Sequence, residues 1–195
     1  MREIIRRILK FILNIFVHIV YRVKIVGKEN IPSEGAAILC ENHVHGLDVV
    51  VIVLTAKREI NGLAKKELFR IGILRWLAKT FGIYAVKRDG SDIGALKISL
   101  KILKDNGLLI IAPEGTRNGM AKGLKPKNGP VSLAIKAGVP IIPIGVNGNF
   151  KAFSKVTLNI GKPIHYDIDA ADKTDLDNLT KELMNEIIKL RDVKI

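Results

Sequence analysis

The sequence predicts an α/β domain with a mixed, largely parallel sheet flanked by helices, preceded by an N-terminal amphipathic membrane-associating helix. Short apolar runs that are typical of buried strands alternate with helical patterns along most of the chain. Hydrophobic residues make up 48% of the sequence but aromatic residues only 5%, which favours an aliphatic core built on strands that are covered on both faces. No linker divides the 195 residues, so we expect one domain at residues 23–195 after a helix at residues 1–22.

Residues 1–21 predict a helix in which a polar side chain recurs at every fourth position. Because four residues overshoot a helical turn by about 40°, this polar row winds around the helix. The apolar stretches are shorter than the about 20 residues that cross a bilayer, and Lys10, Asn14 and His18 would be costly inside one. We therefore expect the helix to lie in a membrane surface. A transmembrane span and an ordinary core-packing helix are the alternatives. The polar row consists of Arg2, Arg6, Lys10, Asn14, His18 and Arg22.

The formal net charge is +13, and residues 1–28 carry seven Lys or Arg against a single Glu. Such a positive end predicts contact with an anionic membrane surface or with phosphorylated substrates, and a solubilising charge excess is the alternative. Aromatic and basic residues are not interleaved, so no nucleic-acid partner is expected. The single cysteine, Cys40, lies in an apolar run and predicts a reduced protein. We expect a peripheral or monotopic protein on the cytoplasmic face of the cell membrane.

Four short apolar runs in the first half of the chain predict strands. Asp48 is expected to open a helix over residues 49–56, because the exposed backbone donors of a helix N-terminus can hold a carboxylate. A second helix is expected from Lys65 to about Thr80, with Gly82 ending it. The four strands are expected at residues 23–26, 36–40, 60–64 and 83–86.

The second half of the chain continues the alternation of strands and helices. Residues 93–105 repeat apolar positions with lysines on the other face, and Asn106-Gly107 is a C-terminal stop. A short helix is expected at residues 131–136, and a final helix follows the cap-like Thr174. Strands are expected at residues 108–112, 139–146 and 156–160. The final helix places five apolar side chains on one face: Leu176, Leu179, Leu183, Ile187 and Leu190.

Two polar motifs follow the strands expected at residues 36–40 and 108–112. The first, Asn42-His43-Val44-His45-Gly46-Leu47-Asp48, pairs a histidine with a carboxylate. His43 can take a proton from a substrate hydroxyl while Asp48 orients the ring and stabilises the imidazolium. The second motif, Pro113-Glu114-Gly115-Thr116-Arg117, offers an arginine that can bind a phosphate through two donors at once. Because such sheets build their sites at the carboxyl ends of strands, we expect the two motifs to meet.

In these motifs the sequence resembles the 1-acylglycerol-3-phosphate O-acyltransferases, also called lysophosphatidic acid acyltransferases, over about residues 24–150. Four blocks occur in the order that is usual for the family: Asn42-His43-x4-Asp48, then residues 64–88, then Pro113 to Arg117, and finally residues 138–144. The sequence departs from the family pattern at Lys87, at Ala112 and in the element from Leu124 to Gly129.

The resemblance implies the transfer of a fatty acyl group from acyl-CoA or acyl carrier protein to the sn-2 hydroxyl of a lysophosphatidate. The product would be phosphatidate, an intermediate of phospholipid biosynthesis. His43 would be the general base and Asp48 its orienting partner, with no covalent acyl-enzyme. No cofactor and no metal are expected.

The resemblance also implies an anion site for the acceptor phosphate. Arg117 would bind the phosphate, and Arg88 and Lys66 would complete the site. Glu114 would accept a hydrogen bond from an acceptor hydroxyl or orient Arg117, and Gly115 would let the backbone approach the ligand closely. The predicted substrate-binding residues are Lys66, Arg88, Glu114, Gly115, Thr116 and Arg117.

Three alternatives stay open at this point. The acceptor could be glycerol 3-phosphate or another lysophospholipid. A noncatalytic protein could bind anionic lipid through the basic N-terminus. A metallohydrolase could use His43, His45 and Asp48 as zinc ligands, with His18 and His165 as the other histidines of the chain.

Overall fold

The computed structural model describes residues 2–86, 93–166 and 173–193. Within these residues, seven strands form one sheet in the order β1-β7-β6-β2-β5-β3-β4, and every neighbouring pair is parallel except β6 with β7. The mixed, largely parallel sheet confirms the predicted fold class. The strands are β1 (Arg22–Val26), β2 (Ala37–Glu41), β3 (Ile60–Lys65), β4 (Ile83–Val86), β5 (Leu108–Ile111), β6 (Ile141–Asn147) and β7 (Lys155–Ile160).

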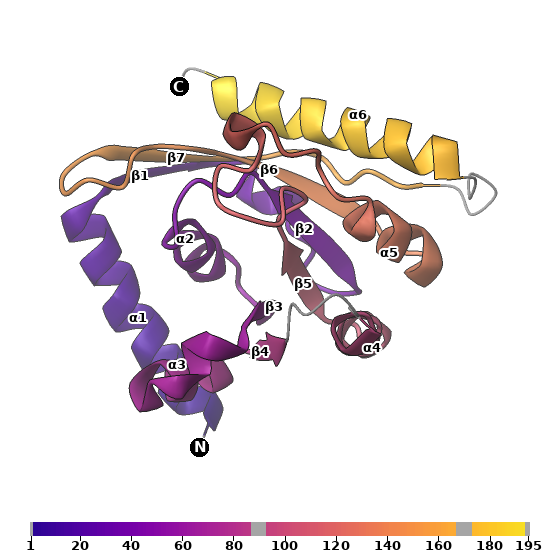
Figure 1. The fold of residues 1–195 in the computed structure, drawn as a ribbon. Coiled ribbons are helices and arrows are strands. Elements are labelled where there is room, and N and C mark those ends of the chain that lie inside the picture. The colour runs from indigo at the N-terminus through magenta and orange to yellow at the C-terminus, as the bar shows by residue number, and fades with distance from the viewer. Residues whose placement is uncertain (1, 87–92, 167–172, 194–195) are drawn as a thin grey trace.

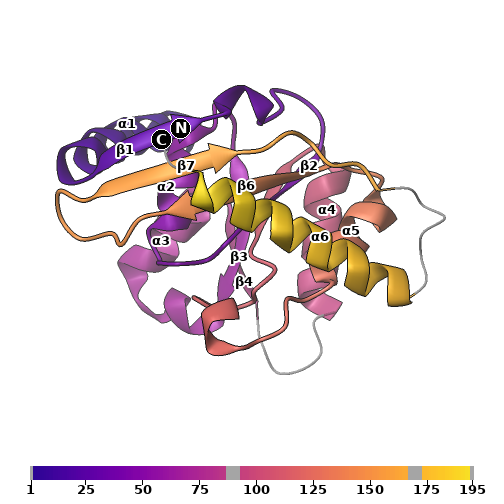
Figure 2. The ribbon, with the colours of Figure 1, turned by 90° about the horizontal axis from the view of Figure 1, so that it is seen from above.

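Helices cover both faces of the sheet, as Figure 1 and Figure 2 show. On one face, Val17 and Ile52 from α1 and α2 pack against apolar strand residues, and on the other face Ile102, Leu133 and Ile187 from α4, α5 and α6 do so. In Figure 1, α6 lies above β6 and β7, with α1 and α2 below them. The helices are α1 (Arg2–Val20), α2 (Asp48–Thr55), α3 (Gly72–Thr80), α4 (Ile93–Lys104), α5 (Gly129–Ala137) and α6 (Lys173–Asp192), with 3-10 turns η1 (Lys28–Asn30), η2 (Lys66–Arg70) and η3 (Met120–Lys122).

The strand order places the two polar motifs side by side. Strand β2 lies in the middle of the sheet, between β6 and β5, and it runs parallel to both. The first motif follows β2 and the second follows β5, so both leave the sheet at the same edge. Parallel strands thus bring together segments that are about seventy residues apart in the chain, as the sequence predicted.

One predicted helix is wrong in its extent. We expected a single helix from Lys65 to about Thr80, but Lys65 pairs with Val86 in the sheet, and η2 follows it directly. Ile71 then takes an extended conformation (ψ 117°) before α3 begins at Gly72. Lys65 pairs with β4 in the sheet and is therefore not helical. Glycine has a low helix propensity, so Gly72 does not favour a helix that continues from η2 into α3. The other predicted elements agree with the structure to within two residues at each end.

Arg6 and Lys10 of α1 contact the rest of the protein. Arg6 forms an ion pair with Glu59, and Nζ of Lys10 donates to the backbone oxygen of Ala56. Burial, together with the positive charges of Arg6 and Lys28, lowers the pKa of Lys10. Among the helices that the structure describes, none is both long and apolar enough to cross a bilayer.

Candidate active site

Asp48 is the anchor of the first motif. Its side chain is fully buried at the first residue of α2. Oδ2 accepts hydrogen bonds from the backbone nitrogens of Val44 (2.9 Å) and His45 (2.8 Å), and Oδ1 accepts one from the nitrogen of Val49 (2.7 Å). Hydrogen bonds to a carboxylate are stronger than neutral ones, so this residue holds the loop from residue 43 to residue 48 in one conformation.

The same carboxylate orients the ring of His43. Nδ1 of His43 lies 3.0 Å from Oδ2 of Asp48, and the histidine side chain is 22% exposed. Because Nδ1 faces the carboxylate, Nε2 is the ring nitrogen that is left for a substrate. A partly exposed imidazole backed by a buried carboxylate is the arrangement that general-base catalysis requires.

Glu114 joins the two motifs. It is buried, and its Oε1 accepts a hydrogen bond from the backbone nitrogen of His43 (3.2 Å) while Oε2 accepts one from that of Met120 (2.9 Å). The backbone nitrogen of Asn118 returns a bond to the carbonyl oxygen of His43 (2.7 Å). These bonds direct both Glu114 oxygens to backbone donors, and the roles predicted for Glu114 toward an acceptor hydroxyl or Arg117 stay predictions.

Two cationic side chains approach this junction. A Cβ at Gly46 would lie 3.7 Å from Nη2 of Arg117, so the guanidinium lies beside the first motif. Lys127 passes over Gly115, where a Cβ would lie 3.0 Å from Cε of the lysine. Gly115 also has a φ of +66°, which favours glycine. Lys127 had no predicted role. The sequence feature that could have indicated a role for this lysine is the lysine-containing element between Leu124 and Gly129.

The remaining predicted residues lie at differing distances from the junction. Thr116 is half-buried between Gly115 and Arg117. Lys66 is exposed and directly follows β3. Strand β3 ends at the same sheet edge as β2, but β5 lies between these two strands. Arg88 lies outside the described residues. The structure therefore brings together His43, Asp48, Glu114, Gly115 and Arg117 from the predicted set.

Two buried polar residues lie where β2 ends, Glu41 as its last residue and Asn42 directly after it. Asn42 donates from Nδ2 to the oxygen of Val146 (2.9 Å) and accepts from the nitrogen of the same residue (2.7 Å), which fastens β2 to β6. Glu41 is 1% exposed, and its Oε1 lies 3.8 Å from Nδ1 of His43. Burial and the negative charges of Asp48 and Glu114 raise the pKa of Glu41 well above its ordinary value. Acidic residues are seldom fully buried, so no sequence signal indicated its place.

The ligand set of the metallohydrolase alternative does not converge in the described residues. The ring of His45 stacks on Phe150 at a centroid distance of 5.1 Å, and its Nδ1 accepts a hydrogen bond from the backbone nitrogen of Leu47 (3.3 Å). A different trio, Glu41, His43 and Asp48, places potential ligand atoms within 4.8 Å of one another. However, Oδ2 of Asp48 already accepts three hydrogen bonds, and this leaves it little capacity to bind an ion.

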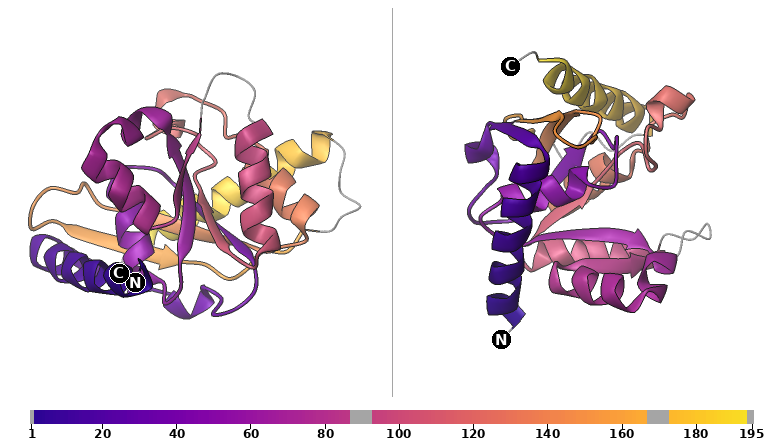
Figure 3. Two further views of the ribbon diagram at one scale, coloured as in Figure 1. Left: turned by 90° about the horizontal axis from the view of Figure 1, so that it is seen from below. Right: turned by 90° about the vertical axis from the view of Figure 1, so that its left-hand side faces the viewer.

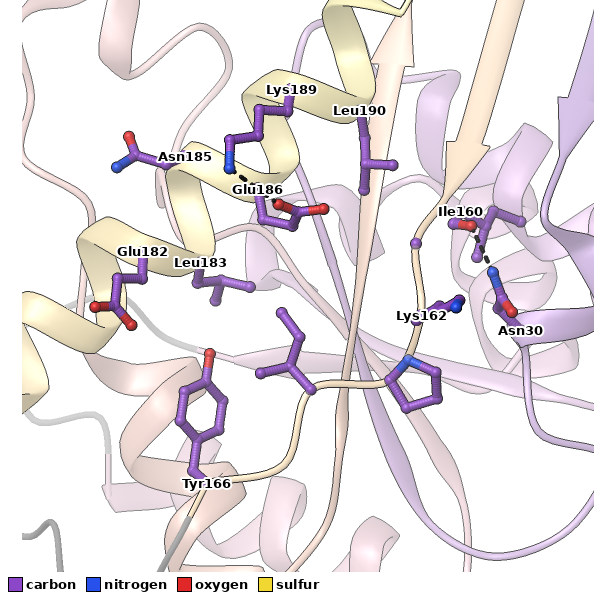
Figure 4. Close-up of a pocket in the computed structure, with 13 residues that line it drawn as sticks. Asn30, Ile160, Lys162, Tyr166, Glu182, Leu183, Asn185, Glu186, Lys189 and Leu190 are labelled. Atoms are coloured by element: carbon purple, nitrogen blue, oxygen red, sulfur yellow. Dashed lines mark hydrogen bonds and ion pairs between the residues drawn. The ribbon is translucent and has the colours of Figure 1, made fainter.

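An open pocket elsewhere on the molecule has a different character. It lies between α6 and the segment that follows β7, as Figure 4 shows. That segment pairs with the first residue of β6 through Ile164 and Ile141, so the pocket lies at the opposite end of β2 from His43. Among its charged groups, Lys189 and Glu186 face each other at 3.6 Å. The pocket therefore has no part in the junction of the two motifs.

The sequence of this chain is similar to those of known acyltransferases. Residues 22–147 match the family described as Acyltransferase. The chain is 27% identical over 184 residues to the 1-acyl-sn-glycerol-3-phosphate acyltransferase of Borreliella burgdorferi, covering 89% of this chain and 74% of that protein. It is 29% identical over 150 residues to the protein of the same name from Bacillus subtilis, covering 73% of this chain and 74% of that one.

A solved structure supports the fold. The crystal structure of the 1-acyl-sn-glycerophosphate (LPA) acyltransferase PlsC from Thermotoga maritima matches with a TM-score of 0.76 and 23% identity, covering 100% of this chain and 83% of that chain. The resemblance predicted from the motifs is thereby confirmed. With its two motifs joined at one sheet edge, the chain belongs to the acyltransferase family.

Proposed function

We propose that the chain transfers a fatty acyl group from acyl-CoA or acyl carrier protein to the sn-2 hydroxyl of a 1-acylglycerol 3-phosphate, forming phosphatidate in phospholipid biosynthesis. The observation that carries this proposal is the His43–Asp48 pair with Arg117 beside its loop. A base and a phosphate ligand then share one site, as an acceptor with a hydroxyl and a phosphate requires. The names of the bacterial relatives support the same acceptor.

In the proposed reaction, Nε2 of His43 takes the proton of the acceptor hydroxyl as its oxygen attacks the thioester carbonyl. The new carbon–oxygen bond forms, and the carbon–sulfur bond breaks when the tetrahedral intermediate collapses. The imidazolium then returns the proton to the leaving thiolate, so the products are phosphatidate and the free thiol of the donor. Asp48 holds the ring in place and stabilises the transient imidazolium.

Around this pair we propose an anion site for the acceptor. Arg117 supplies two parallel donors, and Lys127 adds a positive charge from above Gly115. Glu114 keeps both loops in register through its backbone contacts. The other proposed substrate-binding residues are Lys66, Arg88, Gly115 and Thr116.

Replacing Arg117 with lysine is expected to raise the acceptor KM by more than about tenfold while kcat changes little, because lysine keeps the charge but loses the paired donors. Steady-state kinetics with lysophosphatidate at saturating donor would measure this. The reverse exchange Lys101→Arg on α4, where the side chain is exposed and paired with Asp105, is the control. An unchanged acceptor KM in the Arg117 variant would argue against paired phosphate binding.

We further propose that residues 1–22 anchor residues 23–195 to an anionic membrane surface on the cytoplasmic side. A helix that faces water exposes its polar side, but α1 directs Arg6 and Lys10 inward and apolar side chains outward. Helix α3 lies beside α1 (Figure 1 and Figure 3). The segment η2–α3 also exposes apolar side chains. A large exposed apolar surface marks an interaction site. It comprises Ile4, Ile5, Ile8, Phe11, Ile12, Ile15, Phe16, Ile19, Leu68, Ile71, Ile73, Leu74 and Trp76.

The double substitution Phe11→Ser and Phe16→Ser is expected to weaken vesicle binding at least about tenfold, because each aromatic side chain would leave the lipid interface. Partitioning into sedimented vesicles with and without anionic lipid measures the effect. Both rings are exposed, so the melting temperature should be preserved. Val193→Ser, which removes an exposed side chain just after α6, serves as the control. Equal partitioning of all three proteins would contradict the anchor.

The reaction itself is tested with the purified chain on anionic vesicles. Labelled lysophosphatidate is supplied with either acyl-CoA or acyl carrier protein, and products are identified by mass. Phosphatidate acylated at the sn-2 position is the expected product. Acylation of glycerol 3-phosphate or of another lysophospholipid instead would replace the proposed acceptor. Vesicle binding without acylation of any acceptor would favour the noncatalytic lipid-binding alternative.

A further inference from the structure

The acid at the end of β2 has a setting that the reaction does not explain. Glu41 and His43 are two residues apart, and the Glu41 side chain reaches to 3.8 Å from Nδ1 of the histidine. It is 1% exposed, and its Oε2 makes no hydrogen bond within the described residues. A buried acid without a full set of partners is costly to a fold. Because its Oε1 lies beside Nδ1 of the base, Glu41 is in a position to help hold that ring.

Apart from the imidazole of His43, the groups around Glu41 that act on its carboxyl are negative or apolar. Asp48 faces it from α2, Glu114 from the loop after β5, and both charges act on its carboxyl. Its register partner on β6 is Ile144. Cys40, the preceding residue, is also fully buried, and burial raises the pKa of its thiol. Within the described residues, no lysine or arginine forms an ion pair with Glu41.

These surroundings favour the uncharged form of the carboxyl. An ionised Glu41 would be repelled by the charges of Asp48 and Glu114, and these two carboxylates each accept backbone hydrogen bonds that stabilise a negative charge. The proton therefore belongs on Glu41. An uncharged carboxyl is a weaker acceptor than a carboxylate, so Glu41 lies beside Nδ1 without displacing Asp48 from it.

We propose that Glu41 is a positioning residue that supports the Nδ1 side of the His43 ring as an uncharged carboxyl. The role rests on the proposed function of His43 as the base. Oδ2 of Asp48 and Oε1 of Glu41 both approach Nδ1, at 3.0 Å and 3.8 Å, so the second side chain limits the movement of that nitrogen away from the first. Small displacements of a reacting group are expensive in rate. A ring whose Nδ1 is confined by both side chains presents Nε2 to the acceptor hydroxyl in a single orientation.

Two variants of Glu41 separate support from charge. Glu41→Ala removes the support and is expected to lower kcat at least about tenfold, with both KM values within about threefold of the original. Glu41→Gln keeps the shape and the lack of charge, so it should restore most of the kcat that alanine loses. The control is Thr180→Val, since Thr180 is also buried with an unpartnered oxygen but lies on α6.

A second measurement is independent of the reaction. A carboxyl whose folded-state pKa is raised contributes stability below its ordinary pKa of 4.5, and this contribution is lost as the pH rises toward the folded value. The melting temperature of Glu41→Gln should therefore exceed that of the unmodified chain by a margin that widens from about pH 5 to about pH 8. Thr180→Val should show a constant difference over the same range.

These outcomes decide between the alternatives. If glutamine loses as much kcat as alanine, or if its melting-temperature margin is independent of pH, the carboxyl acts as a charge and the proposal is wrong. Full activity of Glu41→Ala would also overturn it. If the unmodified chain acylates no acceptor, the proposed function fails, while the pH dependence of stability still tests whether Glu41 is uncharged.

Discussion

Replacing His43 with alanine is expected to lower kcat by about 10²- to 10⁴-fold, the range that a general base typically contributes. The physical reason is that the acceptor hydroxyl keeps its proton during the attack on the thioester, since Asp48 is buried and faces the ring rather than the substrate. KM values should change little, because the phosphate ligands are on the other motif. Initial rates of phosphatidate formation at saturating substrates measure the loss.

The His43→Ala protein should remain folded. The histidine side chain is partly exposed, and the backbone bonds of this residue with Glu114 and Asn118 do not depend on the ring. His165→Ala is the matched control, because this exposed histidine lies at the opposite end of the sheet. Near-normal turnover of the His43 variant, with the control unchanged, would mean that His43 is not the general base.

The parts of the site that the sequence predicted are those encoded locally. A short apolar run followed by the His43 and Asp48 motif specifies a strand, a loop and a helix start, and the backbone donors that Asp48 binds all lie within four residues of it. The second motif follows another such strand. Since parallel strands end at one edge, the meeting of the motifs followed from the fold class alone.

What the sequence could not predict depends on partners far along the chain. The sequence predicts a polar row that winds around α1, but it does not indicate that Arg6 and Lys10 bind Glu59 and the oxygen of Ala56. Lys65 has a high helix propensity, yet it pairs with Val86 of β4 and is part of a strand. Glu41 is buried at the end of a central strand, where the charges of Asp48 from α2 and of Glu114 from the loop after β5 act on it. A local sequence pattern does not indicate contacts between residues that are far apart in the chain.

Replacing Asp48 with asparagine is expected to reduce both activity and stability, which distinguishes it from the loss of His43. One amide oxygen cannot take the place of two carboxylate oxygens that accept four hydrogen bonds from His43, Val44, His45 and Val49. In either orientation of the amide, its NH2 group faces a donor. Hydrogen bonds to a charged group contribute about 1.5–3 kcal/mol each, so the melting temperature should fall by at least about 4 °C for a chain of this size.

The Asp48→Asn variant should also lose kcat by about 10²-fold or more, because the ring of His43 is no longer held in the tautomer that leaves Nε2 free to accept a proton. Thermal unfolding and initial rates are measured on the same preparations. Asp105→Asn provides the control, since Asp105 is an exposed acid paired with Lys101 and should shift neither quantity appreciably. Retained stability with lost activity would mean that Asp48 orients the ring without organising the loop. Retained activity would mean that His43 needs no orienting carboxylate, and the catalytic pair would reduce to the histidine alone.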